Sequence, residues 1–316
     1  MAAGITEVGV DRSLRPLALL AVGGAVLTWG CSGVVIKLVS ASGIVTSVYR
    51  LGFALPFLWL TALARPAMRR ALSPRWAVAS LAGGALFAAH QLFFFNALKE
   101  TSVANVSIIG ALQPVLVLLV AGPWFGERPT AGAVGWSLLA VIGAAVVVVG
   151  SKGTPSWSLH GDVLAVINLG AFTAYFLVSK HFRAEVGAGE YVVGMTTVAA
   201  AIVTAIAVLG GEDLASPHGV DWLWLLFLAI VPGTIGHLLS NWAHPHLSAF
   251  LISVLLLAVP VVAALAAMVF LAEPVRPMQV FGGAIVLAAI GILVTANRDG
   301  EEAEELAESV AETDAP

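Results

Sequence analysis

The sequence predicts an all-α, polytopic membrane protein whose ten transmembrane helices form two inverted five-helix repeats. Three observations predict this class: an apolar composition, ten apolar runs of membrane-spanning length, and similarity of the chain to itself at an offset of 146 residues. The 316 residues are 59% hydrophobic and only 11% charged, and the mean hydropathy is +0.96. A soluble domain carries about a quarter charged residues. The composition therefore excludes an ordinary soluble enzyme and a disordered chain, and the lack of a basic excess argues against a nucleic-acid partner.

The ten apolar runs are predicted to cross the bilayer as helices. About 20 residues suffice for one crossing, and a spanning segment must satisfy its backbone hydrogen bonds internally because lipid offers no partners. A membrane barrel is not expected, since its strands alternate in polarity over about ten residues. The predicted spans are 17–38, 43–64, 77–98, 103–123, 131–150, 160–179, 191–209, 222–240, 247–271 and 278–296.

The first run follows Arg12 and Arg15 and leads directly into the second, so we predict a retained helix and not a cleaved signal. Eight of the 19 carboxylates lie in the last 18 residues, which predicts a solvated or frayed acidic tail and leaves a partner-binding role open. The predicted organisation is a cytoplasmic segment 1–16, a first repeat 17–150, an external linker 151–159, a second repeat 160–297 and a cytoplasmic tail 298–316.

The distribution of lysine and arginine predicts the orientation. Ten of these residues fall on the side of the N-terminus and four on the other side. Because positive charge is retained on the cytoplasmic side, both termini are predicted to be cytoplasmic, in a multi-pass protein of the plasma or inner membrane.

The internal repeat is carried by paired prolines and glutamates. Pro114 corresponds to Pro260 and Glu127 to Glu273, and the interval from proline to glutamate is 13 residues in both halves. A repeat of five helices enters the membrane from opposite sides in its two copies. Such inverted halves are typical of transporters that work by alternating access, with the substrate site near the midplane.

Short motifs in a fixed order complete the pattern. They are Leu27-Thr28-Trp29-Gly30, Asn96-Ala97-Leu98, Gln113-Pro114-Val115 followed by Gly126-Glu127, and Val259-Pro260-Val261 followed by Ala272-Glu273. Over about residues 17–297 the chain resembles the EamA-like family of the drug/metabolite transporter superfamily, with Ala272 standing where the family commonly has glycine. The resemblance implies ten helices in two inverted repeats and the export of amino acids or other small metabolites.

The predicted function is therefore secondary active transport of a small organic solute, such as an amino acid or metabolite, across the cytoplasmic membrane, with export as the expected direction. An intramembrane enzyme and a channel remain as alternatives. No cofactor is expected, because the sequence has no phosphate-binding loop, nucleophile elbow or zinc-protease motif. No metal site is expected either: Cys31 is the single cysteine, and no acid stands near His244-Pro245-His246.

Arg50 is the one basic residue clearly inside a span. A charge at that depth is costly and needs a partner or a water-filled cavity. We hypothesise that Arg50 holds a carboxylate or other anionic group of the substrate, or exchanges partners during the cycle. The alternative is a structural arginine that snorkels outward or bonds neighbouring carbonyls.

Further candidates for a substrate cavity combine polar and aromatic side chains, as an orienting and mostly apolar pocket requires. They are Trp29, His90, Gln91, Phe94, Asn96, His237, Asn241 and Trp242. For each residue the alternative is packing or an interhelical hydrogen bond. If transport is coupled to protons, His90 or His237 is the candidate carrier, because histidine titrates near neutral pH.

The remaining predictions are structural. Pro114 and Pro260 are predicted to kink their helices, as structural features, with rocking of the two halves about these kinks left as an alternative. Glu127 and Glu273 are expected to be exposed or in weak ion pairs at helix ends. Five glycines are predicted to allow close helix packing, in which the fifth and tenth helices meet at the periphery, and a homodimer through them is left open: Gly132, Gly135, Gly143, Gly283 and Gly291.

Overall fold

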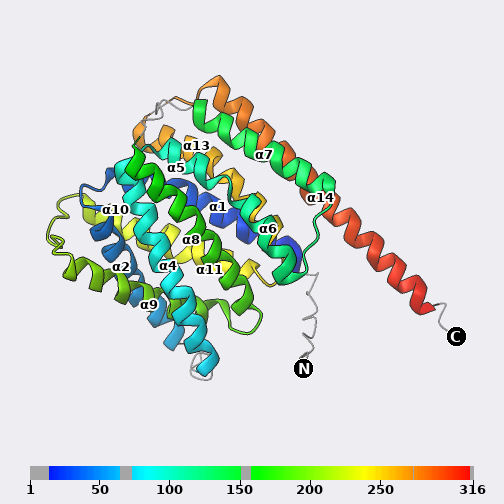
Figure 1. Ribbon diagram of the computed structural model, residues 1–316, viewed down its shortest axis with the longest axis horizontal. Coiled ribbons are helices and arrows are strands. Elements are labelled where there is room, and N and C mark those ends of the chain that lie inside the picture. The colour runs from blue at the N-terminus through cyan, green and yellow to red at the C-terminus, as the bar shows by residue number, and fades with distance from the viewer. Residues whose placement is uncertain (1–13, 65–72, 151–157, 273, 314–316) are drawn as a thin grey trace.

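The computed structural model describes residues 14–64, 73–150, 158–272 and 274–313, and every regular element in these ranges is a helix (Figure 1). The first five spans are α1 (Arg15–Leu38), α2 (Gly43–Leu63), α4 (Pro74–Glu100), α5 (Val103–Gly110) with α6 (Gln113–Phe125), and α7 (Ala131–Gly150). The second five are α8 (Leu159–Arg183), α9 (Ala188–Leu209), α10 (Asp221–Leu228) with η2 (Ala229–Gly236) and α11 (His237–Ala243), α12 (Ala249–Leu255) with η3 (Leu256–Ala258) and α13 (Val259–Leu271), and α14 (Pro277–Thr313). The prediction of ten apolar spans is confirmed.

Most of the predicted N-terminal segment and linker, residues 1–13 and 151–157, lies outside the described ranges. The backbone of α14 continues past the last span into the acidic tail and leaves the bundle (Figure 1). Successive spans run in opposite directions. We call the side on which α1 begins the amino-terminal face, and the side on which α1 ends the opposite face.

Serines define where several helices begin. Each accepts a hydrogen bond from a backbone N–H in the first turn that has no partner inside the helix, which is the usual N-cap arrangement. These residues are Ser42, Ser73, Ser102, Ser158 and Ser248. The caps fix the points at which the chain re-enters the membrane.

The fourth and ninth spans are both interrupted at the same place in the repeat. One break separates α5 from α6, and the other lies at η3, between α12 and α13. Pro114 and Pro260 are the second residues of α6 and α13. A proline in the first turn of a helix removes no internal hydrogen bond, so each predicted kink takes the form of a helix that ends and starts again.

The last helices of the two repeats, α7 and α14, pack along each other at one edge of the bundle (Figure 1). A Cβ atom on Gly143 would lie 3.0 Å from the carbonyl oxygen of Gly282, and one on Gly282 would lie 2.7 Å from that of Gly143. The backbones therefore touch, as predicted for the fifth and tenth helices. The predicted packing role is wrong for Gly135 and Gly291, where an added Cβ would meet no atom within 4 Å, and for Gly132, where it would meet only the hydroxyl oxygen of Thr130 at 3.8 Å.

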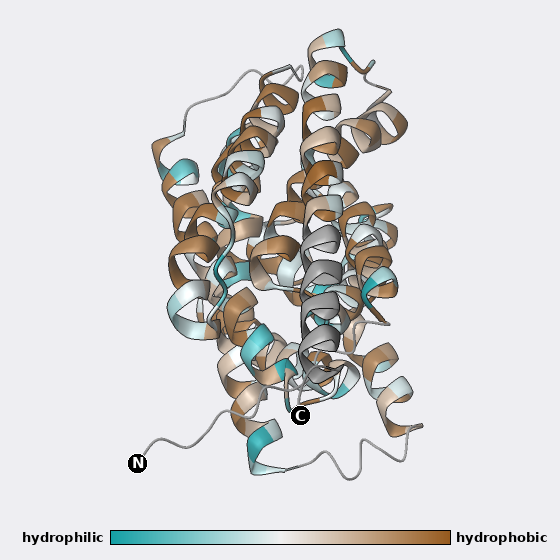
Figure 2. Cartoon of the chain, turned by 90° about the vertical axis from the view of Figure 1, so that its right-hand side faces the viewer, coloured by the Kyte–Doolittle hydropathy of each residue, from teal (hydrophilic) through white to brown (hydrophobic). Residues whose placement is uncertain are grey.

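Apolar side chains face both inward and outward. Leu20, Leu60 and Leu209 are more than 70% exposed, and Figure 2 shows that apolar residues are frequent along the helices of the bundle. Such an outer surface suits a lipid environment. Inside the bundle, α4 packs against α8 and α9, and α1 packs against α13, α11 and η2. The two repeats thus meet around α1, α4, α8 and α13.

Candidate functional site

Arg50 lies about two turns into α2, and its side chain is only 5% exposed. One terminal nitrogen donates to the side-chain oxygen of Gln91, and the other lies 3.3 Å from Nε2 of His237. The rings of Phe87 and Phe95 stand 5.9 and 5.5 Å from the guanidinium carbon. Arg50 therefore neither snorkels outward nor bonds carbonyls of its own helix, and no carboxylate of the described residues forms an ion pair with it.

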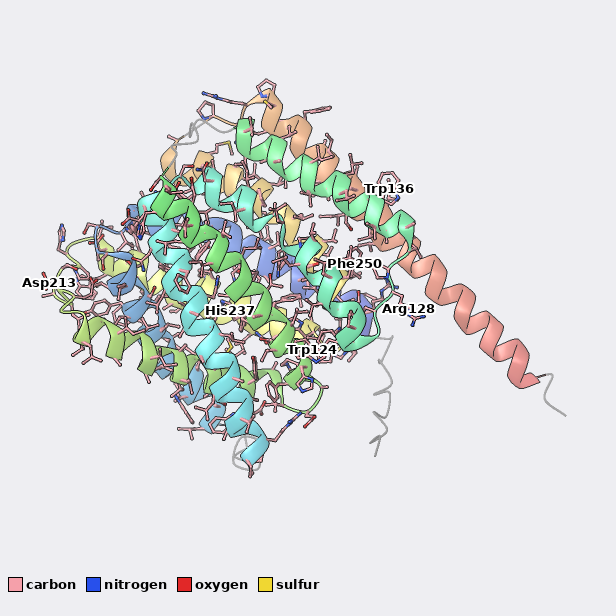
Figure 3. All side chains as sticks on the ribbon, in the orientation of Figure 1. Trp124, Arg128, Trp136, Asp213, His237 and Phe250 are labelled. Atoms are coloured by element: carbon pink, nitrogen blue, oxygen red, sulfur yellow. The ribbon has the colours of Figure 1, made fainter. Side chains whose placement is uncertain are left out.

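His237 connects Arg50 to a second layer of polar side chains in the middle of the bundle (Figure 3). Because a guanidinium can only donate, Nε2 of His237 is the acceptor and Nδ1 carries the hydrogen. Nδ1 lies 3.2 Å from the hydroxyl of Tyr175, which also accepts from Asn241 at 3.1 Å. Asn241 donates again to the carbonyl of His237, at 2.9 Å. The network holds the imidazole in one orientation toward the arginine.

The π-helical segment η2 lies directly before His237. Its wider turns leave carbonyl groups available to other partners, and π-helical segments are frequent at functional sites. The indole nitrogen of Trp29 donates to the carbonyl of Pro232 at 3.1 Å, and the indole ring packs 4.9 Å from the ring of His237. An irregular part of the second repeat is therefore tied to the first helix of the first repeat.

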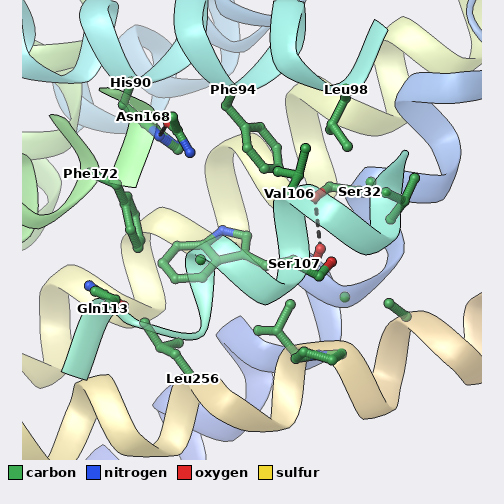
Figure 4. A pocket seen from close by; sticks show the side chains of 18 of the residues that line it. Ser32, His90, Phe94, Leu98, Val106, Ser107, Gln113, Asn168, Phe172 and Leu256 are labelled. Atoms are coloured by element: carbon green, nitrogen blue, oxygen red, sulfur yellow. Dashed lines mark hydrogen bonds between the residues drawn. The ribbon is translucent and has the colours of Figure 1, made fainter. Parts of the chain in front are cut away.

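A pocket of about 180 Å³ lies among these residues, with room for several waters or one small organic molecule. Its walls come from both repeats, and both helix breaks line it (Figure 4). The residues of the breaks that do so are Gly110, Ala111, Gln113, Pro114, Leu256, Leu257, Val259 and Pro260. The apolar part of the wall includes the aromatic side chains of Trp29, Phe94 and Phe172. A mostly apolar cavity with a few converging polar groups is the usual form of a small-molecule site.

The pocket reaches toward the opposite face. Ile36, Leu98 and Val103 line it, and each lies within three residues of a helix end on that face. No lining residue lies that close to a helix end on the amino-terminal face.

On the amino-terminal face, Glu127 connects the end of the fourth span to the start of the ninth. Its carboxylate accepts from the backbone N–H groups of Ala249 (2.7 Å) and Phe250 (3.0 Å), the first two residues of α12. Lys180 of α8 lies 3.2 Å from the same carboxylate and donates to the carbonyl of Leu247 at 2.7 Å. The side chain of Glu127 is 13% exposed and forms an ion pair, so of the two predicted states, exposed or in an ion pair at a helix end, the structure shows the second. Its counterpart Glu273 lies outside the described residues.

The structure brings most of the predicted site residues together. Six of the nine cavity candidates and both prolines line the pocket: Trp29, Arg50, His90, Gln91, Phe94, His237, Pro114 and Pro260. Three do not. Asn96 donates to the carbonyl of Leu92 on its own helix, Asn241 lies behind His237, and Trp242 packs on His246.

Several lining residues were missed by the sequence reasoning. The side-chain oxygen of Asn168 accepts a hydrogen bond from Nδ1 of His90 at 2.7 Å. Gln113 is 3% exposed, and its side-chain nitrogen has no hydrogen-bond partner among the described residues. Ser253 and Phe172 complete this part of the wall. The signal for Asn168 and Gln113 was present, because each is an isolated amide inside an apolar span.

Comparison with known proteins finds one matching family and several similar transporters. The family model of the EamA-like transporter family matches the chain twice, over residues 16–149 and 159–295. An "Uncharacterized transporter" of Archaeoglobus fulgidus is 28% identical over 218 residues, which are 66% of this chain and 75% of that protein. The "Probable terminal-alkyne amino-acid exporter" of Streptantibioticus cattleyicolor is 24% identical over 68% of this chain and 71% of that protein.

A solved crystal structure has the same fold. Its TM-score against this chain is 0.78, at 21% sequence identity, and the match covers 91% of this chain and 99% of the other.

Proposed function

The chain belongs to the EamA-like transporter family, and on this premise we propose that it exports a small organic solute, such as an amino acid or metabolite, by alternating access through the pocket around Arg50. One observation carries the proposal: the pocket lies where the two repeats meet, at the breaks of both interrupted spans. Discontinuous helices at a repeat interface are the usual setting of a transporter's substrate site.

The two functional halves of this proposal are residues 17–150 and 160–297. Trp29, Arg50, His90, Gln91, Phe94 and His237 form the substrate-facing wall, together with Gln113, Asn168 and Phe172. Asn241 acts behind them by orienting His237, to whose carbonyl it donates. Pro114 and Pro260 mark the points at which the helix halves turn relative to each other.

The orientation is proposed from the excess of lysine and arginine on the amino-terminal side. Both termini then lie in the cytoplasm, and the protein resides in the cell membrane. With this orientation the pocket faces outward, and the bonds of Glu127 close the cytoplasmic end. An outward-facing conformation is the one from which an exporter releases its substrate.

If the cycle carries protons, His90 and His237 are the groups to do so, since no aspartate or glutamate is among the described lining residues. A homodimer would use the outer surfaces of α7 and α14, because their inner surfaces pack on each other. The alternative of an intramembrane enzyme is disfavoured: the described partners of the two histidines are Arg50, Tyr175 and Asn168, and none is a serine nucleophile.

Transport by purified protein in proteoliposomes tests the proposal. A panel of amino acids and small metabolites is loaded, and efflux and counterflow are measured. We expect saturable efflux with counterflow for at least one compound. Flux that does not saturate and shows no counterflow would indicate a channel, and absence of flux across the whole panel would contradict the proposal.

A further inference from the structure

We propose that the pocket selects its ligand by charge and takes an organic anion: a molecule with one carboxylate or similar group, an apolar body and no free ammonium. The inference rests on the proposed function and deepens it, because it narrows the amino acids and metabolites considered there to organic acids that carry no free ammonium. Three features of the pocket wall point to a negative ligand, and a fourth argues against a positive one.

The first feature is the charge of Arg50. It is buried in the bundle, and its described hydrogen-bond partners, Gln91 and His237, are both uncharged acceptors in this network. A buried charge without an opposite charge is strongly unfavourable, and membrane helices carry such residues chiefly for function. A carboxylate that enters the pocket supplies the counter-charge that the protein does not.

The second feature is the pair of helix N-termini at the two breaks. Both α6 and α13 are 13 residues long, and neither has a side-chain cap at its start. Gln113, Pro114, Val259 and Pro260, the first residues of these helices, all line the pocket. The N-terminal end of a helix carries partial positive charge and favours an anion.

The third feature is the amide of Gln113. The side chain lines the pocket and is buried, and its nitrogen is an unsatisfied donor. A buried donor without an acceptor is unfavourable. Figure 4 shows this amide on the same wall as His90, Asn168 and Phe172. An anionic oxygen in the pocket would accept its hydrogen bond.

The fourth feature is the lack of acids. Among the described lining residues there is no aspartate or glutamate, while Arg50 is positive. An ammonium group would therefore meet a like charge and find no carboxylate to replace its lost hydration. The apolar body of the ligand has ready partners in Trp29, Phe94 and Phe172.

The test compares binding of four matched compounds to the full-length protein in nanodiscs by calorimetry: 3-phenylpropionate, its neutral amide, phenylalanine and phenethylamine. The series is repeated on indolyl and hexyl skeletons. We expect each acid to bind more tightly than its neutral amide and than the amino acid, and about tenfold or more tightly than the amine. Preference for the amine, the amide or the amino acid, or no acid binding on any of the three skeletons, would overturn the proposal.

Variants of the pocket wall test which residues cause the preference for acids. Arg50→Gln is expected to weaken binding of the acid about tenfold or more while changing binding of the neutral amide by less than about twofold. Gln113→Leu is expected to weaken binding of the acid about fivefold. Arg75→Gln, which alters an exposed ion pair with Glu185 on the amino-terminal face, is the control and should bind like wild type. Acid binding that is unchanged in both Arg50→Gln and Gln113→Leu contradicts an anion site.

The outcome is separable from that of the transport assay. If an amine shows saturable flux that is independent of Arg50, the protein is a transporter and the anion rule fails. If acids bind through Arg50 but none is moved, the anion site stands and the transport function fails.

Discussion

Gly126 and Ala272 occupy equivalent positions in the two repeats, 146 residues apart, and both adopt the left-handed backbone conformation, with φ of 73° and 52°. Each residue ends the helix that follows a break. Glycine enters this region at no steric cost, whereas alanine does so at a cost of about 1 kcal/mol or more. The second repeat thus carries a strained residue where the first has a relaxed one.

Exchange of these two residues should have opposite effects. Ala272→Gly is expected to stabilise the protein and Gly126→Ala to destabilise it, each by about 1 kcal/mol. A Cβ on Gly126 would meet no atom within 4 Å, so the penalty there is one of backbone conformation alone. Thermal unfolding of the detergent-solubilised variants measures both. Two shifts of the same sign would refute the explanation.

Glu127 should matter far more than an exposed glutamate on the same face. Glu127→Ala removes two charge-assisted hydrogen bonds and an ion pair. We expect it to lower the free energy of unfolding by about 2–4 kcal/mol. Glu185→Ala, which breaks the exposed pair with Arg75, should cost less than about 1 kcal/mol.

The Glu127 substitution should also loosen the amino-terminal face. A cysteine placed at Ser253 is expected to react faster with a reagent supplied from that face in the Glu127→Ala background. Equal labelling rates in the two backgrounds would mean that Glu127 stabilises the fold without closing this end.

Arg50→Lys should lower transport, and Arg50→Ala should lower it further. The planar guanidinium reaches Gln91 and His237 at once, which a single ammonium cannot reproduce in the same geometry. We expect about a tenfold loss for lysine and more for alanine, read as the ratio of kcat to KM for efflux. Membrane insertion and the size-exclusion profile serve as controls. Wild-type flux in Arg50→Ala would mean that Arg50 has only a structural role.

The orientation can be read by labelling intact cells. Asp213 and Arg128 are exposed and lie at opposite ends of the bundle (Figure 3). After removal of Cys31, an impermeant reagent added outside should modify Asp213→Cys and spare Arg128→Cys. The reverse pattern would place the termini outside the cell and would exchange the cytoplasmic and external faces of the bundle.

Acid should destabilise the protein through His244, which follows α11 and is 1% exposed. Burial, together with the cations Lys180 and Arg183, holds its pKa well below the ordinary value. The unfolded chain therefore binds more protons once the pH falls below about 6.5, and stability is lost by up to about 1.4 kcal/mol per pH unit. His244→Phe should flatten this part of the pH profile of thermal stability. An unchanged slope would contradict the assignment.

The spans could be predicted from the sequence because lipid requires long apolar helices with internal hydrogen bonds. The polar residues were harder to place. Periodicity shows that His90 and Phe94 share one side of α4, but the rotation of a helix toward its neighbours depends on packing. Asn96 consequently turns away from the pocket, and Gln113 turns toward it.

Glu127 illustrates a different limit. The position of a glutamate after the last turn of a helix predicts a solvent-exposed side chain. Only the tertiary structure brings the start of α12 within reach of its carboxylate. The location of the two helix breaks at one cavity also depends on tertiary packing. Proline predicts an interruption of the fourth and ninth spans, but not that both interruptions meet at one cavity.

The backbone contact between Gly143 and Gly282 has a consequence for how such a chain can diversify. Neither α7 nor α14 contributes a residue to the described pocket wall. A bulkier side chain at this crossing would push the two backbones apart and would act on every substrate alike. Differences in substrate range between related chains should therefore accumulate in α1, α4, α8 and the interrupted spans. The glycine crossing of α7 and α14 should stay invariant as the cargo changes.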